Sequence, residues 1–113
     1  MQDDTITLKK LIDRTMTLDR RFPKQYSKEE GFMDLVEEVG ELAQAMLISS
    51  GAKFTNDPTK QRSIEDVEDA LCDVLFQVIR LAELHGIDLT ISYPKVLNHI
   101  EERFTKGEFD VES

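Results

Sequence analysis

Acidic residues recur at helical spacing between positions 34 and 41. On a helix that turns 100° per residue, Asp34 lies about 20° from Glu41, with Glu37 about 40° to one side and Glu38 about 60° to the other. No Lys or Arg occurs between Asp34 and Met46 to screen these charges, which repel one another across a turn. Carboxylate oxygens are the donors that Mg²⁺ and Mn²⁺ prefer. The cluster therefore permits a divalent-cation site, although the solvated face of an amphipathic helix is the commoner explanation of such spacing.

A second acidic face follows between positions 66 and 77. Relative to Asp73, both Asp69 and Gln77 lie about 40° around a helix. If the two helices pack antiparallel, Glu38, Glu41 and Asp73 can converge as oxygen ligands for a cation. Periodicity alone still favours a solvated stripe, so the spacing permits a site without establishing one.

The elements that must position these acids are helical. Apolar residues recur at helical spacing in four stretches, and no stretch shows the alternation of a strand. Ser27 with Glu30, and Ser63 with Asp66, form the capping-box pattern of a helix start, and Gly86 marks a helix end. The fold class is predicted as all-α, a four-helix bundle in one domain over 1–113, with its core at about 5–104 and a polar tail at 105–113. The expected helices span about 5–21, 27–50, 64–85 and 88–104, with a loop at 51–62.

Composition excludes several partners. The 113 residues carry a formal net charge of -9, which repels duplex nucleic acid and anionic membranes, and no apolar stretch is long enough to span a bilayer. The same charge also suggests an acidic mimic of nucleic acid, but the acids cluster rather than spread. Cys72 is the only cysteine, expected to be partly buried, and fits a reducing cytoplasm. The predicted localisation is cytoplasmic.

Two apolar runs bear on assembly. Residues 42–48 and 74–79 are apolar nearly all round, which leaves more surface to bury than one small bundle can cover. A homodimer, or a homotetramer built as a dimer of dimers, is therefore expected.

Three segments together resemble a known family. Glu38 and Glu41 form an E-x-x-E within residues 37–43, Asp73 begins a second acid-and-apolar segment at 73–78, and a Gly-Ile-Asp-Leu helix break follows at 86–89. In this order and spacing they resemble the MazG-like all-α nucleoside triphosphate pyrophosphohydrolases, over about residues 27–104. The combination is more specific than an E-x-x-E alone.

The resemblance implies hydrolysis between the α and β phosphates of a nucleoside triphosphate, releasing a monophosphate and pyrophosphate, as in house-cleaning of the nucleotide pool. It implies Mg²⁺, with Mn²⁺ as a substitute, held by Glu38, Glu41 and Asp73. Glu37 is the candidate general base for the attacking water.

One position departs from the family pattern. Ala70 stands where the family has the Glu of its second motif, E-x-x-D, so one expected oxygen ligand is missing. Asp69, one turn from Asp73, could replace it as a metal ligand. The alternative is a degenerate relative that keeps the helical scaffold as a non-enzymatic interaction protein.

Substrate contacts are expected from other positions. Lys95, Asn98 and Arg103 resemble the family's basic and amide cluster near the phosphates, although an ordinary solvated helix face explains them equally well. Gln77 shares a face with Asp73, and Tyr26 is an aromatic that could stack on a base.

Overall fold

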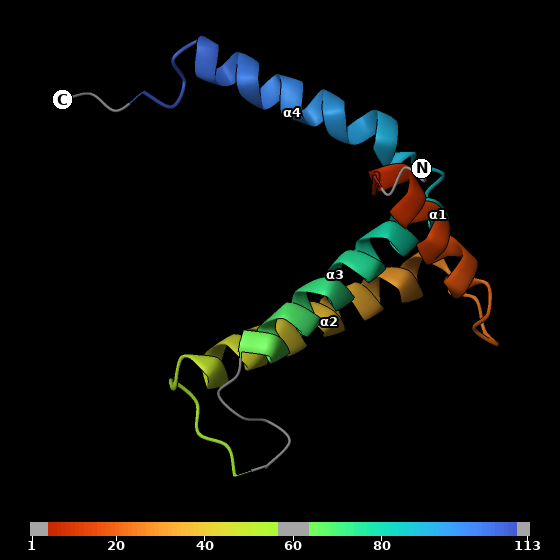
Figure 1. Ribbon diagram of the computed structural model, residues 1–113, viewed down its shortest axis with the longest axis vertical. Helices are drawn as coiled ribbons and strands as arrows, with labels where there is room; N and C mark the ends of the chain where they lie inside the picture. The colour runs from red at the N-terminus through yellow and green to blue at the C-terminus, as the bar shows by residue number, and fades with distance from the viewer. Residues whose placement is uncertain (1–4, 57–63, 111–113) are drawn as a thin grey trace.

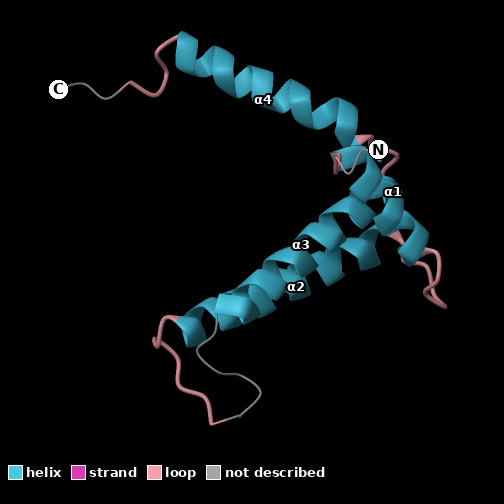
Figure 2. Ribbon diagram, viewed as in Figure 1, coloured by secondary structure: helices cyan, strands magenta, loops and turns pink. Residues whose placement is uncertain are grey.

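The computed structural model describes residues 5–56 and 64–110. Within those ranges the protein contains helices and no strand, so the all-α prediction is confirmed (Figures 1 and 2). The described helices, in chain order, are α1 (Leu8–Asp19), α2 (Lys28–Ser49), α3 (Ile64–Leu84) and α4 (Leu89–Thr105).

Helix α1 is shorter than predicted at both ends. Thr7 is its N-cap, because its hydroxyl accepts a hydrogen bond from the backbone N–H of Lys10 at 3.2 Å. At the other end the side chain of Gln25 donates to the carbonyls of Asp19 and Phe22, at 3.2 and 3.3 Å. The Thr7 hydroxyl replaces a helical acceptor for Lys10, and Gln25 bonds carbonyls at the other end, where Pro23 has no N–H to continue the helix from Asp19.

Helix α2 begins with the predicted capping box. The Ser27 hydroxyl accepts from the Glu30 N–H at 3.2 Å, and the Glu30 carboxylate accepts from the Ser27 N–H at 3.1 Å. Lys24 donates to the other Glu30 oxygen at 2.8 Å. The bond from Lys24, followed by those from Ser27, lowers the pKa of Glu30 to about 2.

The turn between α3 and α4 also follows its predicted pattern. Gly86 adopts a φ of 68°, a conformation that favours glycine, just after α3 ends. Asp88 caps α4 by accepting from the N–H and hydroxyl of Thr90, at 3.0 and 2.6 Å, and these bonds lower the pKa of Asp88. Pro94 lies inside α4. The predicted cap Ser63 lies outside the described residues.

Helices α2 and α3 run antiparallel side by side, as the colour gradient shows, and α1 packs on α3 (Figure 1). Within residues 5–56 and 64–110, few apolar residues are buried: Met16, Ile48, Ala70 and Ile79. Near the start of α2, a Cβ on Gly31 would lie 2.7 Å from Cδ1 of Leu84, so glycine allows the close approach of the two helices there.

Helix α4 leads away from the other three helices (Figure 1), and none of its residues is buried. The radius of gyration of 18.2 Å exceeds the value of about 13 Å expected for a compact domain of this length. A stripe of apolar side chains at helical spacing stays exposed on α4, formed by Tyr93, Leu97, Ile100 and Phe104.

The exposure of Cys72 and the apolar character of the helices can be compared with the predictions from the sequence. The expectation that Cys72 is partly buried was wrong: its thiol is exposed on the outer side of α3, where Leu71 and Leu75 are each 53% exposed. None of the described helices has the length and apolar character needed to cross a membrane.

Candidate metal centre

Glu38 lies at the centre of the acidic cluster, on the part of α2 that faces α3. Its oxygen Oε2 is buried and has no hydrogen-bond partner. Burial raises the pKa of Glu38 to about 7, and the charges of Glu41, Asp73 and Asp34 act in the same direction. An uncompensated carboxylate surrounded by other acids is an arrangement that a cation would stabilise.

Three consecutive members of the α2 face meet in space. Asp34, Glu37 and Glu38 each offer one carboxylate oxygen, and these oxygens lie within 4.8 Å of one another. The spacing i, i+3 and i+4 places the three side chains on one face, one turn apart. They form a set of hard oxygen donors suited to Mg²⁺ or Mn²⁺.

The α3 side of the cluster is weaker in acids. The negative charge of Asp73 on α3 contributes to the raised pKa of Glu38, and the convergence of Asp73 with Glu38 and Glu41 as metal ligands stays a prediction. Ala70 is 8% exposed, so the position where the family pattern has a Glu is buried. Asp69 is exposed, and its role as a replacement ligand stays a prediction.

Arg80 was not predicted from the sequence as a functional residue. Near the acidic cluster, its guanidinium makes several polar contacts. Its guanidinium forms an ion pair with Asp19 of α1 at 2.6 Å and a longer one with Asp34 of α2 at 3.6 Å. It also donates to the Gln77 carboxamide oxygen at 3.2 Å. An arginine within the otherwise apolar run of α3, one turn beyond Gln77, was the available signal.

Aromatic rings complete the surroundings of Arg80. The guanidinium carbon lies 5.2 Å from the ring centroid of Phe22, 4.7 Å from that of Tyr26 and 5.5 Å from that of Phe76. Such distances allow cation–π attraction. We call these residues the Arg80 junction, since they join α1, the segment before α2, α2 and α3: Asp19, Phe22, Tyr26, Asp34, Phe76, Gln77 and Arg80.

Two predicted substrate contacts therefore take part in the junction. The charge of Asp34 and a hydrogen bond to it raise the pKa of Tyr26. Gln77 is buried, and its oxygen accepts from Arg80. Beside Tyr26 and Arg80 lies a hollow of about 220 Å³. Contact of either residue with substrate stays a prediction.

The predicted phosphate-binding residues Lys95, Asn98 and Arg103 are exposed on α4. Arg103 pairs with Glu108 at 2.6 Å and lies 4.5 Å from the ring centroid of Phe109. Because α4 leads away from α2 and α3 (Figure 1), a single copy of the chain does not bring this helix to the carboxylates.

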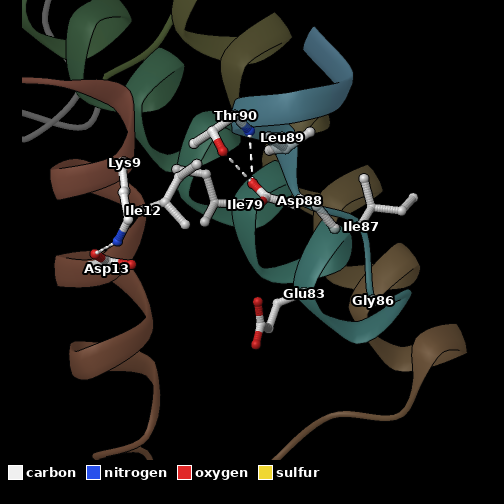
Figure 3. Close-up of a pocket in the computed structure, with 11 residues that line it drawn as sticks. Lys9, Ile12, Asp13, Ile79, Glu83, Gly86, Ile87, Asp88, Leu89 and Thr90 are labelled. Carbon is white, nitrogen blue, oxygen red and sulfur yellow. Dashed lines mark hydrogen bonds and ion pairs between the residues drawn. The ribbon is translucent and has the colours of Figure 1, made fainter.

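A larger hollow of about 370 Å³ lies elsewhere, at the corner where α4 leaves the body (Figure 3). Ile12 of α1, Ile79 of α3 and Leu89 of α4 line it, together with the Lys9–Asp13 ion pair of 2.8 Å. None of the predicted site residues lines this hollow.

Comparison with known proteins bears on this geometry. The family model of the MazG nucleotide pyrophosphohydrolase domain matches residues 27–107. The chain belongs to this family. The match covers α2, α3 and α4 of the MazG domain and leaves α1 outside it. Comparison with curated proteins and with solved structures finds no match.

Proposed function

We propose that this MazG protein hydrolyses nucleoside triphosphates between the α and β phosphates, giving a nucleoside monophosphate and pyrophosphate, with Mg²⁺ as cofactor and Mn²⁺ as a substitute. The observation that carries the proposal is the buried, unpartnered Oε2 of Glu38 among other carboxylates. Without a cation, this group is costly to hold in its charged form.

The proposed reaction needs metal ligands and a general base, and different carboxylates of the chain would supply them. Glu38 and Glu41 of α2 and Asp73 of α3 would hold the cation, with Asp69 as the proposed replacement for the acid absent at Ala70. Bound Mg²⁺ supplies positive charge against the triphosphate oxygens, which the acidic protein would otherwise repel. Glu37 is exposed beside Glu38; although its carboxylate groups with those of Asp34 and Glu38, it would stay outside the ligand set and accept the proton of the attacking water as general base.

Assembly is part of the proposal. The apolar stripe on α4 and the exposed apolar residues of α2 and α3 are surfaces that a homodimer or homotetramer would bury. Since α4 leads away from the carboxylates of its own chain, Lys95, Asn98 and Arg103 would contact the phosphates across such an interface.

The test is pyrophosphate release from a panel of canonical, deoxy and modified triphosphates, with Mg²⁺ or Mn²⁺. Glu41→Gln and Asp73→Asn are expected to lower kcat/KM at least about 100-fold, because each removes a metal-holding carboxylate. Glu68→Gln is the matched control, because Glu68 is an exposed acid of α3 outside the cluster.

Two further variants address Ala70. If Asp69 replaces the missing acid, Asp69→Asn lowers activity, and Ala70→Glu in that background restores it. No pyrophosphate release from any triphosphate would overturn the proposed function and favour the non-enzymatic scaffold.

A further inference from the structure

Arg80 is a buried cation outside the carboxylates assigned above. Its side chain is 9% exposed, and that of its partner Asp19 is 10% exposed. A buried charge is tolerated when it is paired, and the contact of 2.6 Å to Asp19 already supplies one full opposite charge. The second carboxylate, Asp34, is therefore not needed to neutralise Arg80.

Asp34 links the Arg80 junction to the acidic cluster. Its carboxylate lies 3.6 Å from the Arg80 guanidinium and near Tyr26, whose pKa its charge raises, while one of its oxygens groups with those of Glu37 and Glu38. A side chain held from two directions has few rotamers left. Partners of this kind fix the orientation of metal ligands from outside the ligand set.

We propose that Arg80, itself anchored by Asp19, is a positioning residue that orients Asp34 as an additional ligand toward the metal held by its neighbours. This inference rests on the proposed metal-dependent function. Arg80 also offsets part of the repulsion among the acids, because its positive charge lies 3.6 Å from the Asp34 carboxylate.

Helix α1 thereby contributes to the proposed metal centre. Asp19 lies in α1, outside the residues that match the family model, whereas Arg80 and Asp34 lie within them. The ion pair between α1 and α3 would thereby couple the docking of α1 to metal affinity.

The test is a double-mutant cycle on Mn²⁺ affinity, measured on the full chain without substrate from the EPR signal of the free ion. Arg80→Met keeps much of the volume and removes the charge. It is expected to weaken Mn²⁺ binding about 10- to 100-fold in the wild-type background. In the Asp34→Asn background the same change is expected to alter affinity less than about 3-fold, because the route through Asp34 is already broken.

Asp19→Asn provides a second cycle with Asp34→Asn, which decides the matter if Arg80→Met does not fold by far-UV circular dichroism. Arg80→Lys is expected to restore affinity only in part, since an ammonium lacks the planar fork that spans two carboxylates. Lys9→Met is the matched control, because it deletes an exposed ion pair of similar length.

The outcomes separate the two proposals. If the wild-type chain binds no Mn²⁺, the proposed function fails and the role of Arg80 fails with it. If the wild type binds Mn²⁺ and the folded Arg80 or Asp19 variant binds it equally well, only the positioning role is overturned. An equal loss in both backgrounds also overturns it, because the effect would then not pass through Asp34.

Discussion

Two arginines make similar contacts in two regions of this MazG protein. Arg80 pairs with Asp19 at 2.6 Å in the Arg80 junction, and Arg103 pairs with Glu108 at 2.6 Å at the end of α4. Each guanidinium also lies near an aromatic ring. The side chains of the first pair are 9% and 10% exposed, whereas those of the second are 54% and 50% exposed.

Solvent makes the difference between the two regions. Water screens an exposed ion pair and solvates each partner when the pair breaks, so its contribution to stability is small. A buried pair gains less from forming than its distance suggests, but breaking it leaves a charge without solvent. The Arg80 junction is therefore expected to contribute strongly to the folding stability of one copy. Helix α4 is expected to contribute mainly to contacts between copies.

The largest expected effect comes from breaking one of the two ion pairs at a time. Arg80→Met should lower the free energy of unfolding by about 3 kcal/mol or more, because Asp19 is left as a buried, unpaired charge. Arg103→Met should cost less than about 1 kcal/mol. Urea denaturation followed by circular dichroism measures both, and equal losses would contradict the comparison.

A second variant tests whether the exposed apolar stripe of α4 is buried by another copy of the chain. Leu97→Glu places a charge in the exposed apolar stripe and is expected to shift the chain toward monomer, with the helices of one copy intact. Sedimentation velocity over a range of concentrations measures the shift. His99→Glu adds the same charge on the opposite side of α4 and should leave the mass unchanged. A monomeric wild type would remove the proposed assembly.

The acidic cluster is expected to make the folding stability of the metal-free protein depend on pH. The pKa of Glu38 is raised from 4.5 to about 7 in the folded chain, so the folded state binds its proton more tightly than the unfolded state. Its destabilising effect is absent below the unfolded pKa, grows as pH rises and is complete above about 7. With EDTA present, wild type should lose stability relative to Glu38→Gln across this range in thermal melts. A constant difference between the two proteins would refute the shift.

The smallest effects come from the N-caps of α2 and α4. Ser27→Ala removes a capping hydroxyl at the start of α2 and should cost about 1 kcal/mol of unfolding free energy. Asp88→Ala removes the corresponding cap of α4, which buries no residue in one copy. Its expected result is a loss of helical circular dichroism without a comparable shift of the main unfolding transition. A shared shift would mean that α4 unfolds with the other helices.

Much of the fold was predictable because its signals are local. The capping box at Ser27 and Glu30 and the glycine at position 86 act within a few residues, so their sequence patterns correspond to a helix start and a helix end in the structure. The same locality made the α2 acidic face predictable, because i, i+3 and i+4 spacing places side chains together on any helix.

The ends of α1 were less predictable. Apolar periodicity continued past both ends, whereas the helix begins after the Thr7 cap and ends at Asp19, where Gln25 bonds the carbonyl and Pro23 has no N–H to donate. Side-chain bonds to backbone groups compete with the last turns of a helix, and hydrophobic spacing carries no information on them.

The sequence by itself determined the helical class, the capping box at the start of α2 and the acidic face of α2, because each depends on residues within one or two turns. Tertiary structure alone decided that Asp19, Asp34 and Arg80 meet, because three segments distant in sequence must pack before one guanidinium can reach two carboxylates. It also decided that Ala70 is buried while α4 is not. Burial depends on neighbouring helices, and they determine the electrostatic surroundings of Glu38.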